Sequence, residues 1–347
     1  MSTLNVQQQL ENIPPNATRA ERSKRMRLAA RLAPLHTPHR RRKILLFVGV
    51  VLVTLDLCFL PITYYYALKY GTNLKLQDIF AVITAVYGMM SFTHYAWRSW
   101  RLFRTKTSVA CRPLGWKSWG LLEFLHVNVL IIITLVEIEL VAGTAPNKPI
   151  VRLCAMPSPT ICFYLGFLFC GSAILTQLGK KLPFNMSSTP KGTPWRPALV
   201  AFIEDAGSIE GRGGLTYREN VVKRYEASYV FRHMVLVLTW FWGIGLLTVA
   251  TIATALIMTL DLDKGFGIGW GLPWVWAAVW VIATMAYVKM QLRREGELFF
   301  VPKHQMDGGN GSSSAETGAG NEVIYPQLNE DGNGSRNAAG DEEMNVS

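Results

Sequence analysis

Six long apolar segments constrain this 347-residue chain more than any other feature of its sequence. Each can cross the hydrocarbon core of a bilayer, because about 20 helical residues span about 30 Å. Lipid offers no hydrogen-bond partners, so a backbone at that depth has to be helical or part of a closed barrel. The segments lack the alternation of barrel strands, and helices are predicted at Ile44–Leu68, Leu76–Trp97, Trp119–Ala142, Ile161–Leu178, Val235–Thr259 and Trp270–Val288.

The predicted fold is an all-α membrane protein whose six transmembrane helices form three hairpins. The tail beyond the last span is rich in Gly, Asn, Ser and acidic residues, so it can bury little apolar surface and is expected to be disordered. The predicted regions are a basic arm (1–43), four membrane helices with a basic loop at 98–118 (44–178), an amphipathic helical loop (179–234), two membrane helices (235–290) and an acidic tail (291–347).

Lysine and arginine are concentrated on one side of the predicted spans. The N-terminal arm carries ten of them against two acids, the loop after the second span carries six, and the 179–234 loop carries nine. The intervening loops carry one or two each. Because basic loops tend to remain in the cytosol, both termini are expected to be cytoplasmic, in the plasma membrane or an endomembrane.

The formal net charge of +11 indicates anionic partners. A basic arm beside a first span is typical of contact with anionic lipid. Nucleic-acid binding is not expected, because neither interleaved aromatic residues nor a binding fold accompanies the basic residues. The expected partners are the lipid bilayer and, at the inner loop, anionic lipid headgroups or a cytoplasmic protein. No pattern indicates the oligomeric state.

Ionisable side chains inside the predicted spans are candidate binding residues. Asp56 lies near the middle of the first span, where a charge costs about 2.5–3.5 kcal/mol and needs a partner, a wet cavity or a proton. On the third span, Glu123, His126, Thr134 and Glu137 share an arc of roughly 80° that is expected to face the bundle. A contact between Asp56 and His126 would suit a proton relay, and would equally suit a pair that only fixes helix register.

Two helices are predicted in the 179–234 loop. Pro197 occupies a position typical of a helix start, and Thr216 followed by Glu219 has the pattern of a capping box, which predicts a second helix from about Tyr217. The turn between the two helices, called here the glycine turn, contains Gly211, Gly213 and Gly214.

The acidic residues before the glycine turn have several interpretations. Glu204, Asp205 and Glu210 lack the spacing of a calcium loop, although a divalent cation remains one interpretation. Favourable charges at a helix N-terminus, or ion pairs with Arg218, explain them as well. The N–H groups of the glycine turn could also hold an anionic headgroup.

A longer pattern covers about 50 residues around the fifth span. It reads Arg196-Pro197, Ile203-Glu204-Asp205, Gly211-Arg-Gly-Gly214, Tyr217-Arg218, Arg224-Tyr225-Glu226-Ala-Ser228, Phe231-Arg232 and Trp240-Phe-Trp-Gly243. This pattern resembles a family of uncharacterised fungal multi-pass membrane proteins, although Arg212 interrupts the glycines. The resemblance implies a fungal membrane protein and supplies no activity. It singles out as motif residues Arg196, Pro197, Glu204, Asp205, Gly211, Gly213, Gly214, Arg224, Tyr225 and Glu226.

Enzyme signatures are absent from the sequence, so no catalytic residue, metal or cofactor is expected. The pair Glu123-x-x-His126 occurs once, whereas a di-iron helix bundle needs two such pairs. The working hypothesis is a non-enzymatic scaffold or accessory protein whose inner loop contacts partners or lipid headgroups. The alternative is a small proton- or cation-coupled transporter or channel that uses Asp56 and the Glu123/His126 stripe. An intramembrane enzyme is the third hypothesis.

Overall fold

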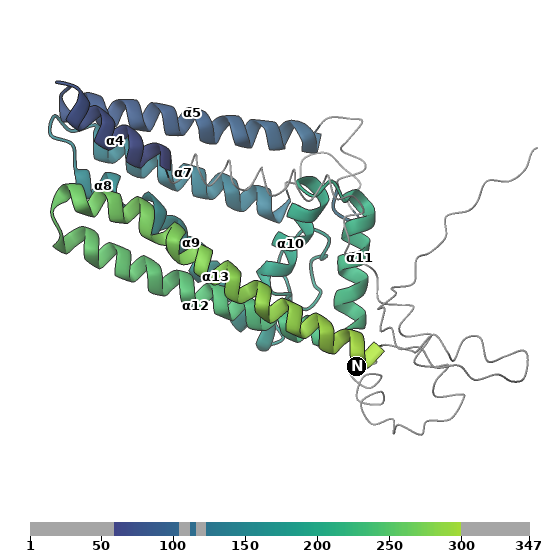
Figure 1. The fold of residues 1–347 in the computed structure, drawn as a ribbon. Helices are drawn as coiled ribbons and strands as arrows, with labels where there is room; N and C mark the ends of the chain where they lie inside the picture. Colours follow the sequence, from purple (N-terminus) through teal and green to yellow (C-terminus); the bar gives the residue numbers. More distant parts are fainter. Residues whose placement is uncertain (1–58, 104–111, 116–122, 300–347) are drawn as a thin grey trace, which may run out of the picture. The chain divides into compact units, whose positions relative to one another are not determined.

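The computed structural model describes residues 59–103, 112–115 and 123–299, without the side chains of residues 296–299. Within these ranges every helix or strand is an α-helix, apart from two isolated β-bridges after α9. The all-α prediction is therefore confirmed for the described residues. The helices, drawn in Figure 1, are α4 (Leu60–Gly71), α5 (Leu76–Phe103), α7 (Phe124–Thr144), α8 (Val151–Cys154), α9 (Pro157–Gln177), α10 (Ala198–Ile209), α11 (Gly214–Ala227), α12 (Tyr229–Thr259) and α13 (Leu262–Phe299).

Five of the described helices, α5, α7, α9, α12 and α13, are long and apolar enough to cross a membrane. Each overlaps one predicted span, and together they indicate an integral membrane protein. The remaining predicted span, Ile44–Leu68, is described only from Phe59 onward, where it ends as α4. Asp56 lies outside the described residues.

Several helices are longer than the apolar segments that predicted them. α5 continues to Phe103, so Arg98 and Arg101 belong to this helix and not to the following loop. α13 continues to Phe299, past the predicted boundary at residue 290. The residues added to these helices are mostly Gln, Leu, Arg and Glu, which favour the helical backbone. The charged residues among them lower the mean hydropathy, so the apolar segments end before the helices do.

The connections between the described helices lie at the two ends of the helix bundle (Figure 1). One end, called here the short-loop end, contains the α4–α5, α7–α9 and α12–α13 connections. The other, called the α10–α11 end, contains the end of α5, the start of α7 and the two helices of the 179–234 loop. This arrangement follows from antiparallel neighbours, because each span returns the chain to the opposite end.

An aromatic core lies toward the short-loop end. The rings of Tyr65 and Phe266 stack with their centroids 4.2 Å apart, and Phe80 and Trp270 pack around them. Trp270 is fully buried, and its Nε1 donates a hydrogen bond to the carbonyl of Cys154 at 3.0 Å. This core joins α4 and α5 to α8 and α13.

α9 and α12 approach closely because glycines line their contact. A Cβ atom on Gly243 would lie 2.6 Å from Cys170 Sγ, and one on Gly166 would lie 3.1 Å from the carbonyl oxygen of Gly243. Small residues allow such backbone approach between membrane helices, where the packing of side chains replaces the hydrophobic effect as the source of association.

Candidate functional site

The chain between α9 and α12 folds into two helices at one end of the bundle. α10 begins directly after Pro197, as predicted. α11 begins at Gly214 and not near Tyr217, with Gly213 as its N-cap residue. Thr216 lies inside the helix, so the predicted capping box does not form.

The glycine turn has a backbone role. The N–H of Gly211 donates to the carbonyl of Ala206 and that of Gly213 to the carbonyl of Gly207, each at 3.0 Å. A Cβ atom on Gly213 would lie 2.5 Å from the Cβ of Tyr217, so a larger residue does not fit there. These two N–H groups are therefore bonded to α10 and are not available to an anionic headgroup.

Arg218 of α11 lies at the centre of this end and is fully buried. Its Nη1 donates to Glu204 Oε1 at 2.8 Å and to Asp205 Oδ1 at 2.6 Å, and its Nη2 donates to Glu123 Oε1. The ion-pair interpretation of Glu204 and Asp205 is therefore confirmed. Glu123, predicted inside a span, is instead the N-cap residue of α7. These four residues and Arg98 are called here the Arg218 cluster.

Two arginines at the end of α5 extend the same network. Arg98 Nη2 donates to Glu123 Oε2 at 2.8 Å, and Arg98 Nη1 donates to Glu210. Arg101 Nη2 donates to the carbonyl of Ile209 at 2.6 Å, at the C-terminus of α10, where the helix dipole favours a cation. The network thus ties α10 and α11 to α5 and α7.

Two serines complete the coordination of the acids. Ser187 adopts a left-handed backbone conformation, with φ of 47°. Its hydroxyl donates to Asp205 Oδ2 at 2.5 Å and accepts from the N–H of Phe124 at 3.2 Å. The Ser188 hydroxyl donates to Glu204. The sequence does not predict the role of either serine, because two adjacent serines in a polar loop form no recognisable motif.

The Arg218 cluster holds more carboxyl groups than guanidinium groups. Three buried carboxylates face two guanidinium groups. Burial and, secondarily, the charge of Asp205 raise the pKa of Glu204 to about 8. Burial also raises the pKa of Asp205 to about 6, although hydrogen bonds from the N–H of Leu125 and from Ser187 lower it. The surroundings of the Glu204–Asp205 pair therefore favour the form that keeps a proton.

The remaining motif residues tie α11 to its other neighbours. Arg224 forms an ion pair with Glu295 of α13, which is buried. Arg196 Nη2 donates to Glu226 Oε1 at 3.0 Å, and its guanidinium lies 5.0 Å from the centre of the Tyr225 ring. The motif is therefore mostly a set of contacts that fix α11 in place.

The residues predicted to form one polar face on the third span do not all face the bundle. Thr134 is exposed and does not face the bundle. His126 is fully buried against α5, where its ring stacks on Tyr95 at 4.4 Å and its Nε2 lies 3.2 Å from Ser99 Oγ. Glu137 lies three turns away along α7, so the structure does not bring it together with His126.

Within the described residues, no three His, Cys, Asp or Glu side chains are arranged to hold a metal ion. The acids weighed as a cation site, Glu204, Asp205 and Glu210, are each contacted by an arginine. The positive charge beside these carboxyl groups thus comes from guanidinium groups.

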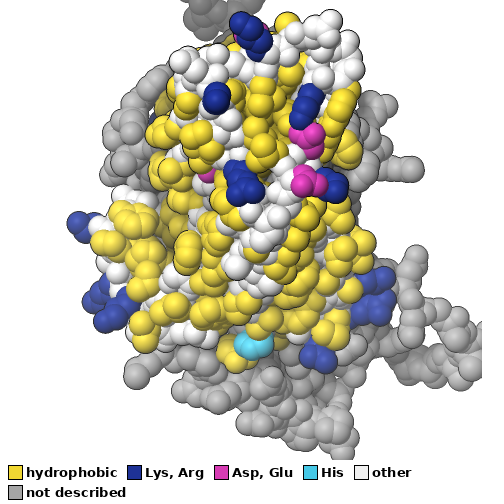
Figure 2. Space-filling model, turned by 90° about the vertical axis from the view of Figure 1, so that its left-hand side faces the viewer, with side chains coloured by type: hydrophobic (Ala, Val, Ile, Leu, Met, Phe, Trp, Pro, Cys, Tyr) yellow, Lys and Arg dark blue, Asp and Glu magenta, His cyan; other side chains and the backbone are white. Residues whose placement is uncertain are grey.

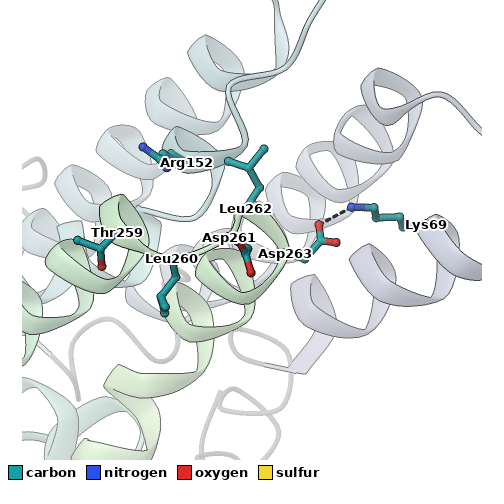
Figure 3. Close-up of a pocket in the computed structure, with 7 residues that line it drawn as sticks. All are labelled: Lys69, Arg152, Thr259, Leu260, Asp261, Leu262 and Asp263. Carbon is teal, nitrogen blue, oxygen red and sulfur yellow. Dashed lines mark hydrogen bonds and ion pairs between the residues drawn. The ribbon is translucent and has the colours of Figure 1, made fainter.

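The short-loop end has an open cleft of about 490 Å³, which the sequence did not predict. Asp263 accepts hydrogen bonds there from Lys69 Nζ, from the Tyr65 hydroxyl at 2.7 Å and from the Tyr70 hydroxyl at 3.0 Å. Figure 2 shows basic and acidic side chains together at this end, surrounded by hydrophobic ones. The paired charges link α4 to α13. The cleft, drawn in Figure 3, is lined by Lys69, Arg152, Thr259, Leu260, Asp261, Leu262 and Asp263.

Replacing the central arginine is expected to be strongly destabilising. In Arg218→Leu the buried carboxylates lose their partner, and the free energy of unfolding is expected to fall by about 3–5 kcal/mol. The matched control is Lys223→Leu on the same helix, whose exposed pair with Glu219 at 3.1 Å is worth at most about 1 kcal/mol. Unfolding by SDS titration in mixed micelles measures both. Equal losses in the two variants would contradict a central role for Arg218.

The proton on the Glu204–Asp205 pair predicts a pH dependence. The pKa of Glu204 is raised from 4.5 to about 8, so the folded protein binds more protons than the unfolded one between these values. Its stability should therefore fall as pH rises from about 5 to about 8. In Glu204→Gln, which stays neutral, this fall should be smaller. Melting temperatures of both proteins across this range test the difference, and parallel curves would rule out a proton on Glu204.

Comparison with known proteins places the chain in a family. Residues 28–299, which include the five candidate membrane helices and the α10–α11 end, match the family described as Domain of unknown function (DUF8766). No curated protein and no solved structure matches the chain. Because the family match spans well over half of the sequence, the chain belongs to the DUF8766 family of domains of unknown function.

Proposed function

We propose that this chain crosses a fungal plasma membrane or endomembrane six times, with both termini and the α10–α11 end in the cytosol. The distribution of charge supports this orientation. Among the described residues, eight exposed basic side chains lie at the α10–α11 end and four (Lys75, Lys148, Arg152 and Lys264) at the short-loop end, and basic segments tend to stay cytoplasmic. The exposed basic residues described at the α10–α11 end are Lys180, Lys181, Lys191, Arg212, Lys223, Lys289, Arg293 and Arg294.

The proposed role is that of a non-enzymatic scaffold or accessory protein that holds anionic lipid headgroups against a rigid cytoplasmic layer. The observation that carries this proposal is the contrast between buried and exposed charge at one end. The Arg218 cluster is buried and fixes α10 and α11, whereas the lysines around it are exposed. Fixed basic side chains near the membrane surface attract anionic lipid, at about 1 kcal/mol per residue.

Cysteine labelling tests the orientation. Lys191→Cys and Lys148→Cys place exposed thiols at the α10–α11 end and the short-loop end respectively. In sealed microsomes with the cytoplasmic face outward, an impermeant maleimide should label Lys191→Cys directly and Lys148→Cys only after detergent is added. The unsubstituted protein gives the background from native cysteines. Labelling in the reverse order would overturn the orientation.

Thermal unfolding in nanodiscs tests the lipid contact. The melting temperature should be higher in phosphatidylserine than in phosphatidylcholine nanodiscs, because bound headgroups stabilise the folded state. The variant Lys180→Gln/Lys181→Gln/Lys191→Gln should lose most of this difference. The control Lys75→Gln/Lys148→Gln/Lys264→Gln removes the same charge from the short-loop end and should retain it. If both variants behave alike, the specific contact is excluded and a protein partner becomes the better explanation.

A further inference from the structure

A row of polar side chains runs along α5 inside the bundle. Thr84, Tyr87, Ser91, Tyr95 and Ser99 follow one another at intervals of three or four residues, so they lie on one face of the helix. Ser91 and Tyr87 are buried and the other three are half-buried. Their spacing is visible in the sequence, but hydroxyl groups barely lower the hydropathy of a span, so hydropathy alone does not indicate the row.

This row faces polar groups of α7 along the length of both helices. Near the short-loop end, Thr84 Oγ1 lies 3.2 Å from Thr144 Oγ1. Toward the α10–α11 end, Ser99 Oγ lies 3.2 Å from His126 Nε2. Arg98, the residue before Ser99, pairs with Glu123, so this end of the row adjoins the Arg218 cluster. The two facing rows are called here the α5–α7 seam.

Glu137 occupies the middle of the seam because α5 has a glycine opposite it. A Cβ atom on Gly88 would lie 3.1 Å from Glu137 Oε2, so the carboxyl group rests almost against the α5 backbone. Gly88 lies next to Tyr87 and three residues before Ser91, so the carboxyl group is beside the polar row. A carboxyl group at this depth is costly and by default indicates function.

Two atoms of the seam are buried without a hydrogen-bond partner among the described residues, Glu137 Oε1 and His126 Nδ1. Elsewhere on α7, Asn128 Oδ1 accepts a hydrogen bond from the Tyr164 hydroxyl of α9 at 2.6 Å, whereas Glu139 Oε2 is also buried without a partner among the described residues. A pair that only fixes helix register satisfies its polar atoms. A group that passes protons has to keep a site open for the next donor or acceptor.

We propose that the α5–α7 seam conducts protons between the short-loop end and the Arg218 cluster, an activity beyond the scaffold role. A proton enters past Thr84 and Thr144 and binds Glu137. It moves along the seam hydroxyls and intervening water to His126 Nδ1, and the imidazole releases its other proton from Nε2 toward Ser99. The Arg218 cluster accepts that proton and releases one to the solvent, so each proton that enters is matched by one that leaves.

The packing of the seam favours a proton over a larger ion. The centres of the Tyr95 and His126 rings lie 4.4 Å apart, and a Cβ atom on Gly88 would lie 3.1 Å from Glu137 Oε2. These separations leave no space for a hydrated metal ion between the two helices at either place. A proton needs only groups that exchange it, and imidazole, carboxyl and hydroxyl groups all do so.

The test uses the full chain reconstituted in liposomes that contain a pH-sensitive dye and carry a potassium diffusion potential. The protein should increase proton influx over protein-free liposomes. In Glu137→Gln the influx above this background should fall at least about tenfold, because the amide cannot release a proton. Glu137→Asp should recover part of it. His126→Gln should lower the influx similarly.

Glu139→Gln is the matched control, because it makes the same change two residues further along α7. Glu139 Oε1 accepts a hydrogen bond from Thr160 of α9 at 3.0 Å, so this residue lies off the seam. The control should conduct as well as the unsubstituted protein. Influx no greater than in protein-free liposomes, or an equal loss in Glu137→Gln and Glu139→Gln, would overturn the proposal. Circular dichroism and size-exclusion profiles establish that each variant is folded, and neither outcome bears on the lipid contact of the α10–α11 end.

Discussion

The buried guanidinium of Arg218 is the interaction on which the α10–α11 end depends. Three carboxyl groups from α10 and from the start of α7 lie around it without contact with solvent. Removing any such group from water costs several kcal/mol unless an opposite charge and hydrogen bonds replace the lost hydration. Arg218 supplies that charge from a third helix, so α10, α11 and α7 can pack together only as one unit. The 179–234 loop is for this reason a structural part of the bundle.

The sequence predicted much of the fold because its signals are local. Apolar length indicated the five described spans, and Pro197 indicated the start of α10. The charge of Arg218 close to Glu204 and Asp205 made their ion pairs one of the expected outcomes. Arg212 was less predictable. It adopts a left-handed conformation, with φ of 52°, so a non-glycine residue serves a position where a glycine was expected.

The site depends on contacts that local signals cannot give. Glu123 joins the Arg218 cluster from 95 residues away, and its place in the chain suggested membrane depth. The α11 start was misplaced because the glycine turn packs against Tyr217 and lets the helix begin earlier than the capping pattern indicated. The polar row of α5 was missed for another reason. A single hydroxyl group is common in a membrane span, and the row is recognised as part of a polar interface only from its contacts with Thr144 and His126 of α7.

The length of α13 has a mechanical consequence. Its 38 residues extend about 57 Å, whereas the hydrocarbon core is about 30 Å thick. Even a tilted helix of this length must project well beyond the apolar layer. Near its C-terminal end, Glu295 forms an ion pair with Arg224 of α11. Because α13 continues as one helix through Pro273, its position in the membrane also sets the position of α11 relative to the bilayer midplane. A thicker or thinner membrane would change how α13 tilts. Through this ion pair, and through Tyr287 and Val288, which pack against the same buried cluster as Tyr217 and Tyr225, it would also change the angle at which α11 meets the lipid surface.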